Sequence, residues 1–244
     1  MRFVFLVCFF IFSSRVFAQY SDGTTGLLHT PSAEMQPVGT VMLGAGFLNK
    51  ELTPNSNSLA WPYHTYNYYV NVTFLSCLEL SYICTLFKRS VGDLPRKWRG
   101  QDRHLAFRLR VLKEGQFWKY MPAVVLGTSD PVTGFQSPGE EGNGHFNKYY
   151  VAATKHIQTR GGELGVHLSY LYSARKTYRL NGPALGISYD LAILKGFRLI
   201  AEYDAKDFYV GFHYRVIRPL MLQAMLQDGQ YFSGGFTFLI PLKL

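Results

Sequence analysis

His167 and Ser169 are the two residues whose types and spacing come closest to catalytic chemistry. They stand two positions apart, so on a β-strand both side chains point to the same face. A histidine that takes the proton of a serine hydroxyl creates a nucleophile, as in some lipid hydrolases. Glu163 shares this face, but no acid is clearly placed to orient the histidine. We therefore expect both residues to be ordinary polar side chains inside the fold, and a lipid hydrolase ranks third among the functions considered.

Charged and imidazole side chains recur on the polar faces of other segments. His104, His167 and His213 lie on different segments, and sequence spacing alone does not bring them together around a metal, so we expect neither a metal nor a cofactor. The arginines could form a basic stripe suited to anionic saccharides, but ion pairing with nearby acids is the favoured interpretation. The candidate inward-facing residues are Arg108, Arg110, Arg198, Arg215, Glu79, Glu163, Glu202 and Asp190.

Composition favours a chain built of strands. Hydrophobic residues make up 48% and aromatic residues 16% of the 244 residues, and the mean hydropathy is −0.01. That average is too polar for a bundle of membrane helices, and it is what alternation of apolar and polar residues would give. Aromatic side chains fit a pleated surface, and they form girdles on membrane barrels. A soluble all-β protein rich in tyrosine remains the alternative on composition alone.

The N-terminus predicts a secretory signal over residues 1–18. Arg2 is followed by an apolar run and then by Val16-Phe17-Ala18, which has small residues at the positions that precede a cleavage site. The apolar run is too short to span a bilayer as a mature helix. Removing residues 1–18 takes away Arg2 and Arg15 and lowers the formal net charge from +9 to +7. A basic exported chain suits anionic lipid headgroups or acidic polysaccharide, and we expect no nucleic-acid partner.

Alternation of apolar and polar residues dominates the chain after residue 39. In Phe208–Arg215, for example, Phe208, Val210 and Phe212 alternate with more polar neighbours. Twelve such segments are expected, each near the ~9–11 residues that a tilted membrane strand needs. They are centred on residues 41–47, 66–74, 79–86, 104–111, 123–128, 149–157, 163–170, 184–191, 197–204, 208–215, 220–227 and 232–240.

The lengths of the connections separate a membrane barrel from a soluble sandwich. We expect long loops at residues 49–65, 88–101 and 129–148, and short turns at 76–78 and 160–162. Long loops at one end and short turns at the other are typical of outer-membrane barrels. The Gly-rich stretch 134–144 lacks the Lys-Ser/Thr of a phosphate-binding loop and is interpreted as a loop. Charged residues also avoid the apolar face, which favours lipid on that side. Together these patterns predict an antiparallel transmembrane β-barrel of about twelve strands.

Residues 19–38 show little periodicity and form a short segment outside the barrel, which is expected over residues 39–244. This segment could fold into the lumen as a plug or lie in the periplasm as an arm that binds a partner. Cys77 and Cys84 could pair in an oxidising compartment, although one falls at a turn and the other in a strand, so a bridge is the less expected outcome.

Part of that segment resembles the N-terminal signature of the YjbH-like family of exopolysaccharide-associated outer-membrane proteins. The signature corresponds to Thr25-Gly26-Leu27, Pro31-Ser32-Ala33 and Gly39-Thr40, so that Gly26, Pro31, Ala33 and Gly39 are its motif residues. The resemblance continues through short pieces in the same order: Asp102-Arg103, Leu112-Lys113-Glu114-Gly115, Pro122, Gly127, Asp130, 150–155, Gly182-Pro183 and Gly186.

The resemblance implies a barrel in the bacterial outer membrane that assists assembly or export of an exopolysaccharide or capsule without being an enzyme. The expected partners are outer-membrane lipid, polysaccharide and periplasmic export proteins. A general or small-solute channel is the alternative function.

Overall fold

The computed structural model describes residues 23–53, 63–91, 94–131, 146–173 and 181–242. The predicted signal at residues 1–18, the start of the N-terminal segment at 19–22 and the Gly-rich stretch 134–144 lie outside these ranges. Among the described residues, no helix has the length and apolar character needed to cross a bilayer.

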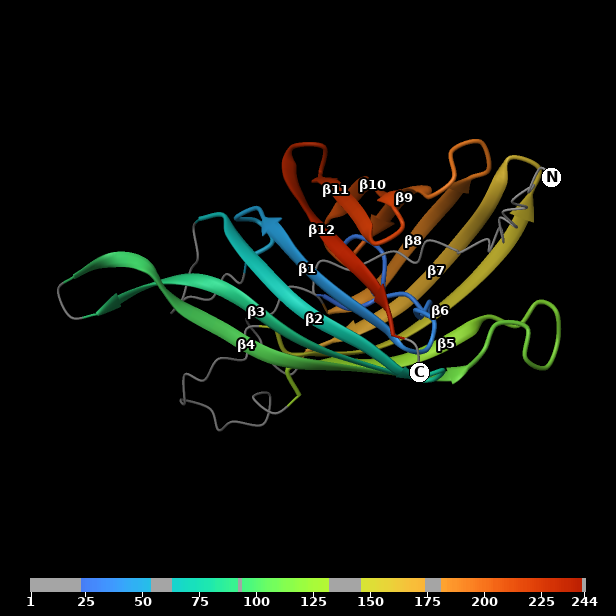
Figure 1. Ribbon diagram of the computed structural model, residues 1–244, viewed down its shortest axis with the longest axis horizontal. Helices are drawn as coiled ribbons and strands as arrows, with labels where there is room; N and C mark the ends of the chain where they lie inside the picture. Colours follow the sequence, from blue (N-terminus) through green and yellow to red (C-terminus); the bar gives the residue numbers. More distant parts are fainter. Residues whose placement is uncertain (1–22, 54–62, 92–93, 132–145, 174–180, 243–244) are drawn as a thin grey trace, which may run out of the picture.

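Twelve antiparallel strands close into one barrel, as the alternation predicted (Figure 1). Each strand pairs with its neighbours in the chain, and β1 pairs with β12 from Thr40 opposite Pro241 onwards. Closure leaves no unpaired edge inside the membrane, where unsatisfied backbone groups would cost several kcal/mol each. The strands are β1 (Thr40–Leu48), β2 (Thr65–Leu75), β3 (Leu78–Val91), β4 (Leu94–Leu112), β5 (Ala123–Ser129), β6 (Lys148–Thr159), β7 (Gly162–Tyr172), β8 (Gly182–Leu191), β9 (Phe197–Tyr203), β10 (Phe208–Ile217), β11 (Leu220–Gln227) and β12 (Tyr231–Pro241).

The outer face of the barrel is apolar, and its inner face is polar. Leu109, Leu168, Leu185 and Val210 point outward and are exposed, whereas the residues between them on each strand are buried in the interior. This is the reverse of a soluble protein, in which apolar side chains fill the core. The apolar outer face must therefore meet lipid, and the protein is a β-barrel of the outer membrane.

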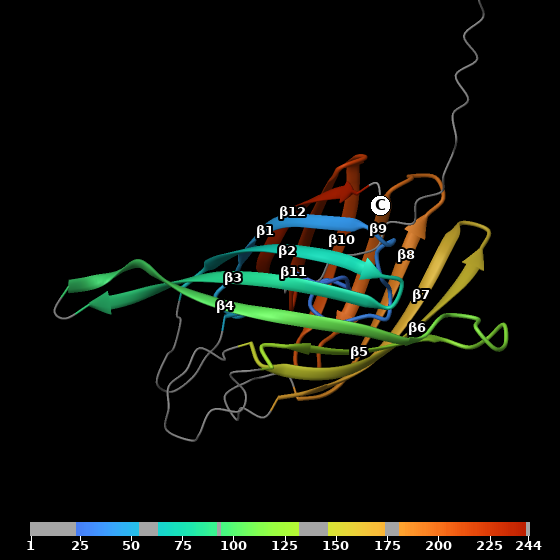
Figure 2. The same cartoon turned by 60° about the horizontal axis from the view of Figure 1, so that its bottom comes forward.

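The prediction of a loop at residues 88–101 is wrong, because β3 and β4 continue through this range as a hairpin. Their ladder runs on to Val91 opposite Leu94. Glycine, aspartate and proline are typical of loops, but Pro95 falls in the irregular stretch of the ladder between Leu94 and Lys97, where a missing N–H breaks no regular pairing. Figure 2 shows this hairpin extending beyond the ends of the other strands.

Connection lengths otherwise follow the prediction. The two-residue turns at 76–77 and 160–161 lie at the end of the barrel where β1 begins at Thr40 and β12 ends at Pro241. In outer-membrane barrels this end faces the periplasm, and the end with longer loops faces outward. The connection 113–122 is long for a periplasmic turn, and its Glu114 contacts His156 of the barrel wall.

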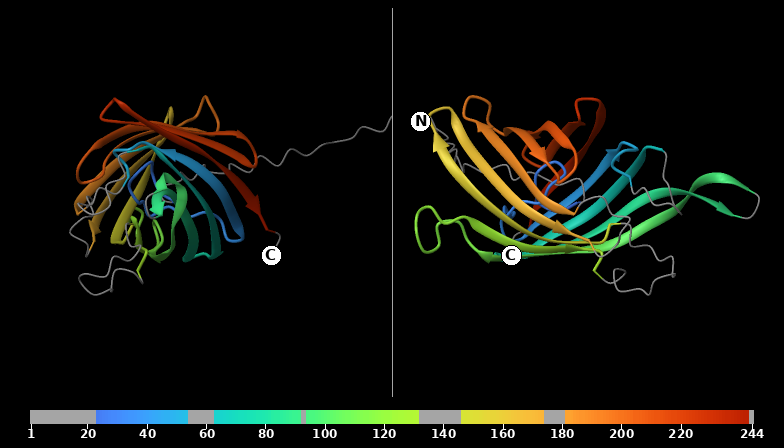
Figure 3. Two further views of the ribbon diagram at one scale, coloured as in Figure 1. Left: turned by 90° about the vertical axis from the view of Figure 1, so that its left-hand side faces the viewer. Right: turned by 180° about the vertical axis from the view of Figure 1, so that it is seen from behind.

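Residues 23–38 lie inside the barrel, a position visible in Figure 3, and we call them the plug. The plug turns back on itself, with the Leu27 N–H bonded to the Thr30 carbonyl at 2.9 Å and a bridge between Gly26 and Pro31. It then enters β1 through Gly39, whose φ of 77° is a left-handed conformation that glycine adopts without strain. The Gly39 N–H donates to the Thr73 carbonyl of β2 at 2.9 Å, which fixes the plug to the wall.

Candidate functional site

The plug packs against two neighbouring stretches of the lumen wall with two small apolar contacts. Leu27 and Leu28 are fully or almost fully buried against Ile200, Tyr209 and Met225 of β9, β10 and β11. Ala33 and Met35 pack in a second cluster with residues of β5 to β8. Burial of one leucine side chain stabilises the contact by roughly 1.5–3 kcal/mol, so these leucines contribute substantially to holding the plug in place.

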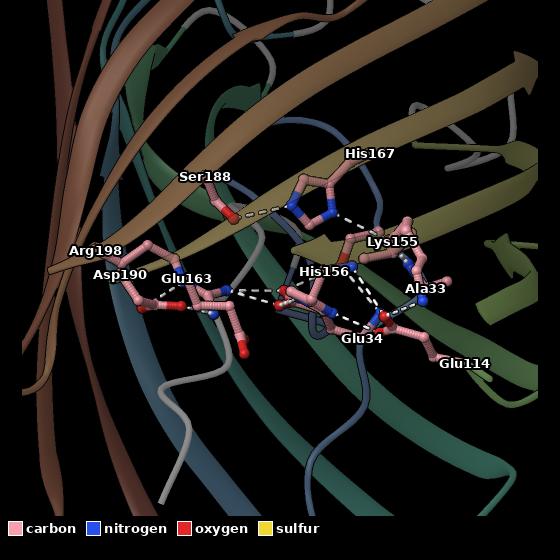
Figure 4. Close-up of polar contacts among 12 residues, drawn as sticks. Ala33, Glu34, Glu114, Lys155, His156, Glu163, His167, Ser188, Asp190 and Arg198 are labelled. Carbon is pink, nitrogen blue, oxygen red and sulfur yellow. Dashed lines mark hydrogen bonds and ion pairs between the residues drawn. The ribbon is translucent and has the colours of Figure 1, made fainter. Parts of the chain in front are cut away.

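Glu34 is the one formally charged residue of the plug, and it lies at the centre of a network of ionic contacts (Figure 4). Its carboxylate oxygens lie 2.8 and 2.9 Å from Arg198 Nη1 on β9, and Oε1 lies 2.9 Å from His156 Nε2 on β6. Burial alone would raise the pKa of Glu34, but the positive charge of Arg198 and the hydrogen bond from His156 outweigh it and hold the pKa below its ordinary value. Glu34 is therefore a buried anion held between two walls of the barrel.

The partners of Glu34 are themselves held by further acids. Arg198 forms a two-pronged pair with Asp190 of β8, with Nη2 to Oδ2 at 2.6 Å and Nε to Oδ1 at 2.9 Å. His156 Nδ1 lies 2.7 Å from Glu114 of the 113–122 turn. Both ring nitrogens of His156 thus face carboxylates, an arrangement that only the doubly protonated ring satisfies. We call Glu34, Arg198, Asp190, His156 and Glu114 the latch.

Glu114 lies outside the strands and is partly exposed. Partial burial favours a higher pKa, but hydrogen bonds from the His156 ring and backbone, together with Lys155, bring the pKa of Glu114 below its ordinary value. The latch therefore runs as a chain of alternating charges from the periplasmic turn, through His156 and the plug, to β9 and β8 of the wall.

Two more acids of the wall bind the backbone of the plug. Glu79 on β3 accepts a hydrogen bond from the Thr25 N–H at 2.7 Å, and it pairs with Arg108 of β4 at 2.7 Å. Arg108 in turn donates to the Glu34 carbonyl at 2.8 Å. Glu202 on β9 accepts from the Leu28 N–H at 3.1 Å and from the His29 N–H. These N–H groups lie outside the twelve strands of the barrel, and the wall acids satisfy them.

The far end of the plug is tied to a turn at the outer end of the barrel. His29 Nδ1 lies 2.7 Å from Asp204, in the turn between β9 and β10. Burial would raise the pKa of Asp204, but the hydrogen bond and charge of His29 bring it below the ordinary value. The plug is therefore anchored at both ends of the lumen as well as in the middle.

The inward-facing candidates from the sequence divide into three groups. Arg108, Glu79, Arg198, Asp190 and Glu202 all belong to the contacts that hold the plug. Glu163 is buried and accepts from Gln158, and Arg110 reaches the Ser76 carbonyl in the β2–β3 turn. Arg215 is half-buried near the periplasmic end of β10. Arg108 and Arg198 each pair with acids, so these two positions do not form a bare basic stripe.

The three histidines singled out for chemistry lie on three different strands, β4, β7 and β10. His167 is buried, with Nδ1 3.0 Å from Thr154 Oγ1 and Nε2 3.0 Å from Ser188 Oγ, so its ring is engaged on both sides by residues other than Ser169. His104 contacts Asp102 at 3.2 Å, and His213 is buried on β10. Within the ranges the structure describes, no group of three or more His, Cys, Asp or Glu could hold a metal ion. Cys77 and Cys84 are free thiols.

The four motif residues of the sequence resemblance have structural roles in the plug. Gly26 and Pro31 form the bridge that closes its turn. The Ala33 N–H donates to Thr154 Oγ1 of β6 at 2.8 Å, and Gly39 makes the entry into β1. Glu34 was not among the residues predicted from the sequence, although it directly follows the Pro31-Ser32-Ala33 motif. It carries the only formal charge in residues 23–38, and this was the signal that could have identified it.

The fold and this site define an outer-membrane β-barrel whose lumen is occupied by its own N-terminal segment. The family model described as "Exopolysaccharide biosynthesis protein YbjH" matches residues 18–243, and the chain belongs to this YjbH family. No curated protein matches the chain closely enough to count as a relative.

Solved structures with a similar trace include other outer-membrane barrels. An outer membrane channel from Pseudomonas putida F1 has 12% identity and a TM-score of 0.46, over 87% of this chain and 100% of that chain. Outer membrane phospholipase A from Escherichia coli has 12% identity and a TM-score of 0.37, over 85% and 98%. The calcium-bound phospholipase dimer from Salmonella typhi has 11% identity and a TM-score of 0.37, over 84% and 90%.

Proposed function

We propose that this protein assists the assembly or export of an exopolysaccharide at the outer membrane, as a non-enzymatic barrel whose lumen its own plug closes. The observation that carries the proposal is the latch. A residue of the family signature segment is joined through Glu34 and Arg198 to the barrel wall, and the side chains of both residues are buried. Membership of an exopolysaccharide biosynthesis family supplies the substrate class.

The filled lumen weighs against the alternative of a general porin. A general porin keeps a water-filled channel through the barrel. Here Glu79, Arg108, Arg198 and Glu202 are almost inaccessible to solvent, because the plug covers them. Passage of a solute or polymer would require the plug to move, and this suits a protein that acts on a signal or with a partner.

A lipid hydrolase has less support. Both ring nitrogens of His167 lie against Thr154 and Ser188 in the interior, where they cannot reach the acyl chains that surround the barrel. The polysaccharide itself and periplasmic export proteins are the partners we propose, and the wall residues that hold the plug are those that would control access to the lumen.

The test is to measure surface and released polysaccharide in a strain that lacks the gene and has an otherwise intact envelope. We expect polysaccharide to fall or change location, and expression of the wild-type protein to restore it. Expression of Glu34→Gln should restore it incompletely, whereas Glu51→Gln, a matched change in the β1–β2 connection, should restore it fully. Unchanged polysaccharide in the deletion strain would defeat the proposal, and raised permeability to small solutes in wild-type cells would favour the channel.

A further inference from the structure

The hairpin of β3 and β4 continues past the barrel as a free ribbon. The pairing of β2 with β3 ends at Asn67 opposite Thr85, and the pairing of β4 with β5 ends at Ala106 opposite Ser129. Beyond these points the ladder of β3 with β4 is the one strand pairing among the described residues. Side chains of Thr65 and Tyr63 bond the β3 backbone at Leu86 and Lys88, at the base of the ribbon. The ribbon projects from the outer end of the barrel (Figures 1 and 2), so it lies on the side where a surface polysaccharide would be.

The ribbon is strongly basic for its length. Residues 86–103 include six lysines and arginines and two aspartates. Asp102, one of the two, is buried at the base beside His104. Lys88 and Lys97 form no ion pair with any acid that the structure describes. The positive charge of this stretch favours an anionic ligand.

An aromatic surface lies beside these charges. Trp98 is 46% exposed and Tyr66 is 52% exposed, and their ring centroids are 6.3 Å apart. Tyr63 meets Trp98 edge-on at 5.6 Å. Lys88 Nζ lies 4.9 Å from the Tyr63 ring and 5.0 Å from the Trp98 ring, so cation and rings form one surface. We call Tyr63, Tyr66, Lys88, Lys97 and Trp98 the ribbon patch.

We propose that the ribbon patch binds an acidic polysaccharide, with the apolar face of a sugar ring on Trp98 and the carboxylates of uronic-acid units at Lys88 and Lys97. The charge and the exposed rings match the two features of such a polymer, its anionic groups and its apolar ring faces. Lysines and arginines on exposed strand edges also prevent pairing with the strands of other molecules, and this alone could account for the charge of the ribbon. It does not account for an exposed aromatic cluster with a lysine over it. The identity of the ligand as a polysaccharide rests on the proposed function.

Lipopolysaccharide shares this chemistry, because it carries sugars and anionic groups. The ribbon favours the free polymer, because it projects past the strand ends instead of lying along the outer leaflet. The experiment must therefore present both ligands separately.

The test measures binding of labelled polygalacturonate oligosaccharides to the purified full-length barrel in detergent free of lipopolysaccharide. We expect binding that weakens as salt rises, and no binding of neutral dextran. Trp98→Ala and the double variant Lys88→Gln/Lys97→Gln should each weaken binding by at least about fivefold. The chain provides matched controls in Trp118→Ala and Lys119→Gln, an adjacent tryptophan and lysine in the 113–122 turn at the other end of the barrel, and these should bind as the wild type does.

Heat-modifiable migration on gels shows that each variant remains a folded barrel. The proposal is overturned by a lack of polygalacturonate binding, by equal loss in the control variants, or by binding that lipopolysaccharide micelles show and polygalacturonate does not. If the deletion strain loses polysaccharide while the ribbon variants bind normally, the proposed function stands and this inference fails. If the deletion leaves polysaccharide unchanged but polygalacturonate binding depends on the ribbon patch, this inference stands and the proposed function fails.

Discussion

At the scale of single residues, Glu34 holds the plug, and its removal should open the lumen. In Glu34→Gln, Arg198 keeps Asp190 but loses the carboxylate that joins it to the plug. Breaking a buried ion pair typically costs about 3–5 kcal/mol, and the remaining Asp190 should place the loss near the lower end. We expect a lower urea midpoint and a higher conductance in planar bilayers. Glu51→Gln should change neither, and unaltered conductance in Glu34→Gln would show that the latch does not close the lumen.

The pH dependence of closure follows from the same carboxylate. The pKa of Glu34 is held below the ordinary value of 4.5 by Arg198 and His156, against the opposing effect of burial. A carboxyl with a lowered pKa stabilises the folded arrangement fully above the ordinary glutamate range, and this contribution disappears as pH falls through the lowered pKa. Wild-type conductance should therefore stay low under mildly acidic conditions and rise only well below the ordinary range. A conductance series against pH tests this, and opening near neutral pH would contradict it.

At the scale of elements, the plug should be separable from the barrel. Deleting residues 21–36 removes all of the plug except its last two residues and keeps Gly39 and the whole β1–β12 ladder. We expect a folded barrel with raised conductance, because the wall residues that the plug covers become exposed to water. A deletion of residues 117–120, which removes exposed turn residues, is the control and should leave conductance low. No change on deleting the plug would mean that it does not close the lumen.

The fit between plug and wall can be tested at Gly186 of β8. A Cβ atom there would lie 2.3 Å from Leu27 Cδ1, so a side chain at this position must push the plug leucine aside. Gly186→Val should raise conductance without loss of the barrel, and Leu27→Ala should partly reverse this in the double variant by making room. A double-mutant cycle on conductance measures the coupling. If the two substitutions change conductance additively, the side chains at positions 186 and 27 do not contact each other.

Periodicity could identify the elements but not what fills them. The alternation in Phe208–Arg215 predicted both the strand and its two faces, because lipid on one side and a polar lumen on the other impose a strict period of two. The plug has no such period. The contact between Glu34 and Arg198 joins positions 164 apart and depends on the path of a segment whose conformation only the surrounding walls determine. The extension of β3 and β4 was missed because Gly92, Asp93 and Pro95 have the composition of a loop.

At the scale of the whole molecule, the two faces of the barrel should differ sharply in their tolerance of charge. Leu168 points outward from β7 and is 58% exposed. An arginine near the bilayer midplane costs about 2–4 kcal/mol, so Leu168→Arg should lower the yield of folded barrel in the outer membrane. Ile193→Arg changes an even more exposed residue, but in the 192–196 turn that faces water, and it should be tolerated. Heat-modifiable migration in membrane fractions measures both, and equal tolerance would argue against lipid around β7.

The arrangement of contacts along the plug also has a mechanical consequence. A pull toward the periplasm applied at Gly23 would not load all the contacts together, because they follow one another along the chain. The Ser81–Gly23 bond would take the force first and the Thr25–Glu79 bond second. The bonds of Leu28 and His29 to Glu202 would follow, and the Glu34–Arg198 pair would be loaded after these. Contacts loaded in series rupture one at a time, at lower force than the same contacts sheared in parallel. The plug is therefore built to be peeled out from its N-terminal end, while Gly39 keeps it tethered to β1.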